Sequence, residues 1–223
     1  ENMYGTYFSN PLSDLIQNEN YSRSTQVYVN AFADIKLWKG LVFRTEYAAN
    51  YNYNTGYRFT PSYDYEFFKQ QSSASRSAGN GSNWTLKTYL TYNGTFGKHN
   101  VSVMAGHEAQ ENNWESLDGS RTNFLFNSVH ELNAGDATTA KANSSRGSSA
   151  IESYFGRLNY NFADRYLLTA TLRADGSSSF AKESRWGWFP SVALAWKVNN
   201  EAFLKDVEAI NSLKLRLGWG VVG

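Results

Sequence analysis

The three histidines are the first residues to test for chemistry, because imidazole serves both as a metal ligand and as a general base. His99, His107 and His130 are scattered along the chain, and their spacing matches no metal-binding pattern. The chain contains no cysteine, so thiolate chemistry and disulfide bonds are both excluded. We therefore expect neither a metal site nor any other cofactor.

The segment DGSSSF (175–180) is the second candidate, because an acid precedes three serines. A nucleophilic serine on a hydrolase elbow requires G-x-S-x-G, and a calcium loop requires oxygen ligands at alternate positions. Neither pattern is present, whereas an Asp-Gly turn at the end of a strand accounts for the same residues. Similarly, GWG (218–220) precedes no helix and is no phosphate loop. These observations indicate that the protein is not an enzyme.

Strands are the elements that must position any functional residue, because apolar and polar residues alternate through most of the sequence. Most of the predicted strands are longer than the five or six residues usual in soluble sheets and approach the length of a membrane-crossing strand. We predict eight strands, at about 26–37, 41–53, 83–96, 100–110, 151–162, 166–175, 187–198 and 212–222.

The connections between these strands alternate in length. Tight turns are expected at 38–40, 97–100 and 163–165, long segments rich in Ser, Asn and Gly at 54–82 and 111–150, and a shorter segment at 176–186. Short turns on one side and long loops on the other are typical of outer-membrane barrels. Two further segments, 11–17 and 199–211, predict short helices.

The two faces of each strand differ in polarity. In 213–221, Leu and Trp residues alternate with Lys214, Arg216 and glycines, and 166–175 divides in the same way. A water-filled lumen would solvate charges placed deep within such strands. The alternative, which we favour, is that these charges pair with one another or with another domain. The residues predicted to face the lumen are Arg44, Glu46, Lys87, Arg157, Arg173, Asp175, Lys197, Lys214 and Arg216.

Aromatic residues are abundant, with seven Trp, 15 Tyr and 14 Phe. Several lie near the ends of the apolar strand faces, as the aromatic girdles of a membrane barrel do. The predicted interfacial aromatics are Trp84, Phe96, Tyr166, Trp188, Trp196 and Trp219. A soluble amphipathic sheet with aromatics in its core is the alternative at this point. The net charge of +1 favours no nucleic-acid partner, and no apolar run is long enough for a transmembrane helix.

The segments 153–180, 185–198 and 213–223 resemble, in order and spacing, the barrel of SusC/RagA-type TonB-dependent outer-membrane transporters. The segments 10–20, 40–63 and 99–110 are similar to earlier barrel segments of that family, and the resemblance is weakest in 111–150. The segment DGSSSF departs slightly from the family's usual pattern, because the family more often has a basic residue where Ser179 stands and a glycine where Ala181 stands.

This resemblance implies an all-β fold, in which about eight antiparallel strands form part of a transmembrane barrel of about 22 strands. The family's barrels enclose an N-terminal plug that engages the TonB complex, and a SusD-like surface lipoprotein covers the extracellular mouth. The cargo is an oligosaccharide or an oligopeptide, and the barrel contacts the lipid of the outer membrane of a Gram-negative bacterium. No plug is recognisable here, so we expect residues 1–223 to be a partial barrel domain, incomplete at both ends.

The predicted long loops carry aromatic side chains whose faces would stack well on sugar rings. The candidates for ligand or lid contact are Tyr57, Phe59, Tyr63, Tyr65, Phe67 and Trp114. Ordinary packing of the loops explains these aromatics equally well.

Two other proteins fit the same strand pattern. The first is a small, complete eight-stranded structural barrel, although GWGVVG (218–223) lacks the terminal aromatic that closes such barrels. The second is a soluble, secreted β-sandwich that binds carbohydrate. The flanking sequence or the mass of the intact protein would separate both from the importer.

Overall fold

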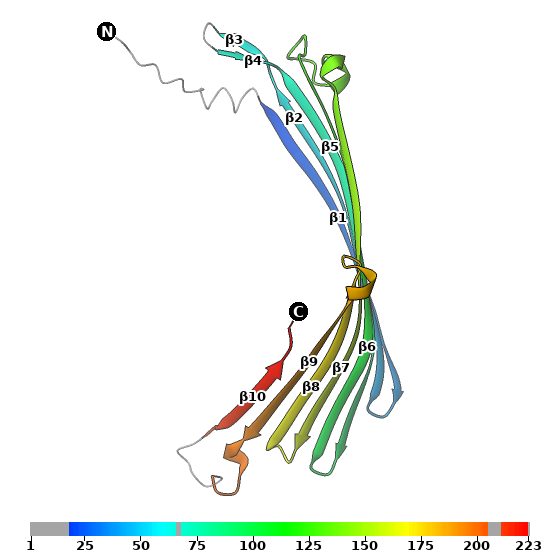
Figure 1. Cartoon of the computed structure of the whole chain (residues 1–223), viewed down its shortest axis with the longest axis vertical. Helices are drawn as coiled ribbons and strands as arrows, with labels where there is room; N and C mark the ends of the chain where they lie inside the picture. Colours follow the sequence, from blue (N-terminus) through cyan, green and yellow to red (C-terminus); the bar gives the residue numbers. More distant parts are fainter. Residues whose placement is uncertain (1–17, 66–67, 205–210, 223) are drawn as a thin grey trace, which may run out of the picture. The chain divides into compact units, whose positions relative to one another are not determined.

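Eight long strands form one sheet, in which consecutive strands of the chain lie beside one another, in the order β1-β2-β5-β6-β7-β8-β9-β10 (Figure 1). The computed structural model describes residues 18–65, 68–204 and 211–222. The strands are β1 (Glu19–Trp38), β2 (Leu41–Thr60), β5 (Ser73–Phe96), β6 (His99–Thr122), β7 (Lys141–Phe162), β8 (Tyr166–Ser177), β9 (Trp186–Lys197) and β10 (Lys214–Gly220). The small strands β3 (Tyr63–Tyr65) and β4 (Phe68–Gln70) pair with each other. The predicted sheet of eight strands is confirmed.

Helical structure is confined to short 3₁₀ turns in the described part of the chain. These are η1 (Leu132–Ala134), η2 (Ala137–Thr139), η3 (Lys182–Ser184) and η4 (Val198–Asn200). Within the described ranges, no helix is both long and apolar enough to cross a membrane. The helix predicted at 11–17 lies outside the described residues. Of the helix predicted at 199–211, residues 205–210 lie outside the described residues, and the preceding residues form the 3₁₀ turn η4, a bend at 201 and a turn at 202–204.

The chain divides into two compact units, which share several strands. The first unit comprises residues 1–27, 51–82 and 113–147, and the second comprises 28–50, 83–112 and 148–223. The second unit holds the tight turns, and the first holds the long connections between β2 and β5 and between β6 and β7.

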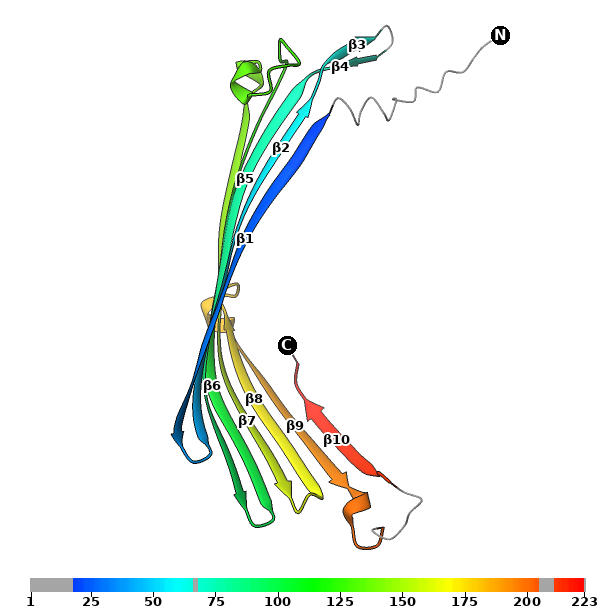
Figure 2. The same cartoon turned by 180° about the vertical axis from the view of Figure 1, so that it is seen from behind.

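Three tight turns lie at one end of the second unit, where they join β1 to β2, β5 to β6 and β7 to β8 (Figures 1 and 2). Each turn uses left-handed backbone, with φ of 82° at Gly40 and 60° at Gly97, and with φ of 54° and 55° at Ala163 and Asp164. At Gly40 a side chain would also lie 2.2 Å from the carbonyl oxygen of Asn93. Glycine is therefore required there, and the predicted turns are confirmed.

The pairing register places the predicted apolar residues on one continuous face. Leu168 of β8 lies opposite Tyr160 of β7 and Leu194 of β9, and Leu194 in turn lies opposite Leu217 of β10. Directly paired residues of neighbouring strands share a face of the sheet. The split read from alternation in 166–175 and 213–221 is therefore the split that the structure shows.

The prediction of long loops at 54–82 and 111–150 was wrong in extent, because the strands on either side continue into both segments. Strand β2 continues to Thr60 and β5 begins at Ser73, while β6 continues to Thr122 and β7 begins at Lys141. Polar side chains on both faces hid the extensions of β5, β6 and β7, because period-2 alternation marks a strand only where one face is apolar. The extension of β2 does alternate, with Tyr57 and Phe59 on one parity and Arg58 on the other, and it was missed. Pro61 directly follows β2, as expected for a residue that donates no backbone hydrogen bond.

Candidate functional site

The polar face of the second unit begins with a charged cluster on β1 and β2. The Arg44 guanidinium donates from Nε to Glu46 Oε1 at 2.5 Å and from Nη1 to Asp34 Oδ2 at 3.2 Å. The same guanidinium lies over the Phe32 ring, 4.7 Å from its centroid. Arg44 is thus held by two carboxylates and one aromatic face, which leaves this cluster with a net charge of about −1.

An aromatic pair connects this cluster to the strands beyond it. The hydroxyl of Tyr89 on β5 donates to Glu46 Oε1 at 3.2 Å, and the Tyr89 ring lies 6.3 Å from that of Phe155 on β7. Gly106 on β6 permits this contact, because a side chain there would lie 2.5 Å from Tyr89 Cβ and 2.7 Å from Phe155 Cζ. Gly106 is therefore a position where close approach excludes any larger residue.

The far end of this face carries a second charge pair. Arg173 Nε donates to both carboxylate oxygens of Asp175, at 2.7 and 2.9 Å, and Arg173 Nη2 donates to Ser153 Oγ at 2.9 Å. The guanidinium also approaches the Phe155 ring, 5.9 Å from its centroid. Six residues of β2, β5, β7 and β8 form a line in which each contacts the next. We call this line the polar row, and its members are Arg44, Glu46, Tyr89, Phe155, Arg173 and Asp175.

The structure brings together four of the nine residues predicted to face the lumen, namely Arg44, Glu46, Arg173 and Asp175. Lys87 pairs instead with Glu108 at 3.3 Å, and Arg157 donates to Asn159 at 3.2 Å. Lys197 lies at the turn end, where its Nζ contacts Asp164 Oδ1 at 2.5 Å. Lys214 and Arg216 are exposed on β10, opposite Lys197 and Ala195.

Sequence analysis missed Tyr89, Phe155 and Gly106. The signal was present for the first two, because each occupies the polar parity of its strand. The assignment of this face to a lumen stays a prediction.

A small buried cluster organises the loop end of the first unit. Phe59 is only 1% exposed and packs edge-on against Phe124, with centroids 5.6 Å apart. His130 stacks on Phe59 at 4.0 Å, and its Nδ1 lies 3.2 Å from the Glu19 carboxylate. The Ser72 hydroxyl accepts from the Phe124 backbone N–H at 2.8 Å, which ties the two long connections together.

Polar contacts fix the remainder of this loop end. Arg76 lies over the Tyr57 ring at 4.6 Å and donates to Glu131 at 2.8 Å. Asp136 accepts from the hydroxyl and the backbone N–H of Thr138, at 2.7 and 2.8 Å, and so caps η2. These two hydrogen bonds hold the pKa of Asp136 below its usual range. The connection between β6 and β7 is therefore a defined structure.

The aromatics predicted on loops have diverse positions. Tyr57 and Phe59 lie on β2 and Trp114 lies on β6, so their placement in loops was wrong. The side chains of Tyr57 and Phe59 are buried, whereas Trp114 is exposed. Tyr63 and Tyr65 lie on β3, and Phe67 lies outside the described residues. Contact with a ligand or lid stays a prediction for all six.

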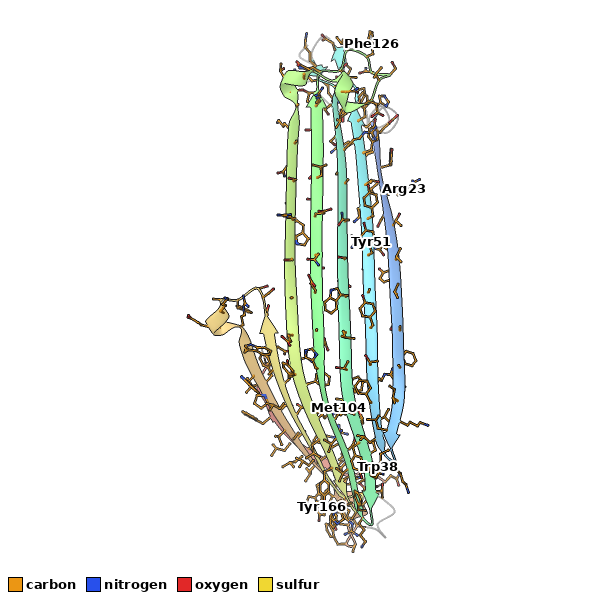
Figure 3. The ribbon with its side chains drawn as sticks, turned by 90° about the vertical axis from the view of Figure 1, so that its right-hand side faces the viewer. Arg23, Trp38, Tyr51, Met104, Phe126 and Tyr166 are labelled. Atoms are coloured by element: carbon orange, nitrogen blue, oxygen red, sulfur yellow. The ribbon has the colours of Figure 1, made fainter. Side chains whose placement is uncertain are left out.

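Two aromatic rows cross the apolar face of the second unit. The first follows the turn end, with ring centroids of His99 and Phe162 4.8 Å apart, Phe162 and Tyr166 6.3 Å apart, and Tyr166 and Trp196 6.5 Å apart. Figure 3 shows Tyr166 at this end. The second row runs from His107 to Tyr154 at 4.9 Å and on to Trp186 at 5.9 Å.

The distance between these rows fits a membrane barrel. On β7 the rows are marked by Tyr154 and Phe162, eight residues or about 27 Å apart along the strand. A strand tilt of 35–45° reduces this to about 20 Å across the membrane, close to the apolar band of about 25 Å on such barrels. Of the predicted interfacial aromatics, Tyr166 and Trp196 belong to the first row, and Phe96 ends β5 at the adjacent turn.

Of the other three predicted interfacial aromatics, Trp188 lies at the level of the second row and Trp219 at the level of neither row. Trp84 donates to Glu111 at 3.2 Å, and Trp188 pairs with Ala174, directly opposite Tyr154 on the far side of β8. Trp219 pairs with Val192, midway between Trp188 and Trp196, so it belongs to neither row. Alternation assigned its face, but its level along the strand depends on the register.

No group of three or more metal-ligating side chains is assembled within the described ranges. The residues of DGSSSF also serve local structure, since Asp175 is held by Arg173, and the Ser178 hydroxyl accepts from the Ala150 backbone N–H at 2.8 Å. What the site offers chemically is a polar, charge-paired surface on one face and an aromatic-bordered apolar surface on the other.

A single antiparallel meander with one polar and one apolar face fits the wall of a β-barrel, and comparison with known proteins assigns the chain to one. The family model described as TonB dependent receptor-like, beta-barrel matches residues 2–222. The chain belongs to this family.

Individual relatives place the chain more closely. It is 33% identical over 232 residues to the TonB-dependent receptor P3 of Formosa agariphila, covering 100% of this chain and 23% of that protein. It is 40% identical over 144 residues to the TonB-dependent receptor SusC of Bacteroides thetaiotaomicron, covering 63% of this chain and 14% of that protein. The chain thus spans less than a quarter of the length of either relative. The resemblance to SusC/RagA-type receptors is confirmed.

The same fold occurs in a solved structure. The structure titled RagAB peptide transporter superposes with a TM-score of 0.89, at 22% identity, over 98% of this chain and 25% of that one. At this identity the match shows the fold, and it supports the assignment of the sheet to a barrel wall.

Proposed function

We propose that this chain forms part of the barrel wall of an outer-membrane importer, with its polar face toward the lumen and its apolar face toward lipid. The observation that carries this proposal is the pair of aromatic rows, whose separation of about 20 Å across a tilted sheet matches the apolar band of membrane barrels. The tight turns then lie on the periplasmic side and the long connections on the extracellular side, as in other barrels of this kind.

The polar row gives the lumen wall a fixed character. Its two arginines are each held by a carboxylate and an aromatic ring, so the surface keeps polar edges and ring faces in place without a large net field. Such a surface suits an uncharged, hydroxyl-rich cargo, which binds through hydrogen bonds and stacking. We infer that the cargo is an oligosaccharide, with an oligopeptide as the second candidate because the RagAB relative in fold is titled a peptide transporter.

The complete importer requires partners beyond this chain. From the resemblance to the SusC/RagA type we infer energy coupling through a plug and the TonB complex, and capture of the cargo by a SusD-like surface lipoprotein. The buried Phe59 cluster and the capped η2 supply a preformed extracellular end that a lid would need as a docking surface.

One experiment tests the import function and its cargo class together. A strain that lacks the full-length protein is grown on mixed oligosaccharides or mixed oligopeptides as the limiting nutrient, with and without the complementing gene. Loss of growth on oligosaccharides alone, restored by complementation and abolished again without TonB, is the expected result. Loss on peptides alone would replace the cargo assignment, and unchanged growth on both would contradict the import function.

A further inference from the structure

The apolar face of the second unit contains a furrow at the level of the second aromatic row. Its volume is about 770 Å³, and β6, β7, β8 and β9 all contribute to its lining. Ala105, Gly156 and Ala174 supply small residues on its floor, and Leu172, Trp186 and Trp188 supply large walls. The side chains of these three wall residues are between 46% and 62% exposed.

Glycine makes the furrow open at its centre. A side chain at Gly156 would meet only the carbonyl oxygen of Met104, at 3.8 Å, and Gly156 lies opposite Leu172. By contrast, a side chain at Gly176 would lie 2.9 Å from the Trp186 indole, so this ring rests directly against the Gly176 backbone. The open space above Gly156 and the Trp186 ring, which rests against Gly176, belong to the same open apolar furrow.

A second, polar depression adjoins this furrow and shares Trp186 with it. It has a volume of about 470 Å³, and its charged lining residues are Glu111, Glu152 and Arg185. Glu152 accepts from the Tyr154 hydroxyl at 2.9 Å and lies 3.1 Å from His107, while Glu111 accepts from Trp84 at 3.2 Å. The second aromatic row therefore separates an apolar space from a polar one lined by fixed carboxylates.

We propose that this pair of spaces is a lipid-binding site, in which the furrow holds one acyl chain and the polar depression holds the headgroup of the same lipid. The proposal rests on the proposed placement of the apolar face in the membrane. An aromatic row marks the level at which lipid tails meet headgroups. A lipid bound at that level therefore has its acyl chain beside the apolar furrow and its headgroup beside the polar depression.

The lining also selects among headgroups. Carboxylate oxygens only accept hydrogen bonds, so Glu111 and Glu152 favour a headgroup that donates them, through an ammonium or hydroxyl group. Arg185 adds a guanidinium, which pairs well with the lipid phosphate. A choline headgroup has neither N–H nor O–H, and we expect it to bind more weakly.

The test uses the full-length protein in nanodiscs that contain equal amounts of phosphatidylethanolamine, phosphatidylglycerol and phosphatidylcholine with identical acyl chains. Lipids that remain bound after detergent exchange are counted by native mass spectrometry. We expect one donor-bearing lipid to be retained at least fivefold above phosphatidylcholine. The relative retention of the first two lipids reports whether ammonium or hydroxyl is preferred.

Two variants fill or polarise the furrow. Gly156→Leu fills the open space of the furrow, and Leu172→Gln places an amide in the furrow without added bulk. Leu217→Gln is the matched control, because Leu217 is 73% exposed on the same apolar face but lies outside the furrow. Both furrow variants are expected to lose at least fivefold in lipid retention, while the control retains the lipid.

Three outcomes overturn the site. The first is that both furrow variants retain as much lipid as the unaltered protein. The second is that Leu217→Gln loses as much lipid as the furrow variants, and the third is that phosphatidylcholine is retained as well as the donor-bearing lipids. Failure of the unaltered protein to integrate into nanodiscs would overturn the membrane placement as well. Normal integration together with absent lipid retention would overturn the lipid site alone.

Discussion

Glu201 Oε1 accepts hydrogen bonds from the Tyr166 hydroxyl at 2.7 Å and from the Trp196 indole N–H at 3.0 Å. Its other oxygen, Oε2, accepts from Arg165 Nη1 at 3.1 Å. One carboxylate after β9 thereby joins the beginning of β8 to the end of β9, at the aromatic row of the turn end. Donors that favour the charged form lower the pKa of Glu201, Tyr166 first and Trp196 second.

The first prediction is that Glu201→Gln destabilises the turn end in a pH-dependent way. A carboxylate whose folded pKa is lowered contributes stability that is complete above its unfolded pKa of about 4.3 and is lost as pH falls through the folded value. At pH 7 we expect the variant to unfold a few degrees below the unaltered protein. The difference should shrink below about pH 4, as a thermal unfolding series from pH 7 to pH 3 would measure.

Glu183→Gln is the matched control for this prediction, because Glu183 is an exposed glutamate in η3. It should leave the unfolding temperature unchanged at every pH. A Glu201→Gln deficit of the same size at pH 3 and pH 7 would show that the carboxylate's charge is not what stabilises the turn end.

The second prediction concerns two glycines on neighbouring strands. Gly106→Ala places a methyl group 2.5 Å from Tyr89 Cβ and 2.7 Å from Phe155 Cζ, whereas Gly156→Ala meets no atom closer than 3.8 Å. Overpacking of this kind costs about 1–3 kcal/mol. We expect Gly106→Ala to reduce the unfolding temperature and membrane yield, and Gly156→Ala to change neither.

A compensating substitution identifies the cause of that loss. Phe155→Leu removes the ring that the new methyl group would touch, so the Gly106→Ala/Phe155→Leu double variant should recover part of the stability. If both single glycine variants behaved alike, close packing of the polar row at Gly106 would be ruled out as the reason for the loss.

Much of the second unit could be predicted from sequence, because its strands have one apolar face. Alternation in 166–175 placed Leu168 and Arg173 on opposite faces, and the pairing register agrees. The same principle failed in 73–82, where polar residues such as Ser77 and Asn80 occupy both parities and yet form a strand. There the backbone ladder and neighbouring strands determine the structure, and single-strand alternation does not record them.

The site was only partly accessible to sequence analysis for a related reason. Parity identified the charges of the polar face, but it could not reveal that Arg44 contacts Glu46 and Phe32, or that Tyr89 and Phe155 connect the two charge pairs. These contacts depend on which residues of neighbouring strands lie opposite one another. The level of Trp219 was missed for the same reason, because its position relative to the other aromatics is set by the pairing register of β10 with β9.

The third prediction tests the polar row in transport. Arg173→Lys keeps the positive charge but removes the planar fork that holds Asp175 and Ser153 together. We expect several-fold slower uptake with normal membrane yield, because the wall loses its fixed geometry while its charge persists. Uptake of labelled cargo by whole cells at equal receptor density is the measurement. Lys182→Arg in η3 is the control, and a similar loss there would remove any special role for Arg173.

The fourth prediction concerns the loop end of the first unit. Phe59 is 1% exposed between Phe124 and His130, whereas Phe126 is 66% exposed and projects at the loop end (Figure 3). Truncation of a buried phenylalanine costs about 3–5 kcal/mol. Phe59→Ala should therefore loosen the connection at 123–140, and limited proteolysis of intact cells should cut it at least tenfold faster.

Phe126→Ala removes the same side chain from an exposed position and should leave the cleavage rate unchanged. If a lid docks on a preformed loop end, Phe59→Ala should also reduce co-purification of the surface lipoprotein, because ordering the loop would then oppose binding. Rapid cleavage with unaltered co-purification would separate the two ideas, since the cluster would order the loop without preparing a docking surface. Equal cleavage of Phe59→Ala and Phe126→Ala would contradict the role of the buried cluster itself.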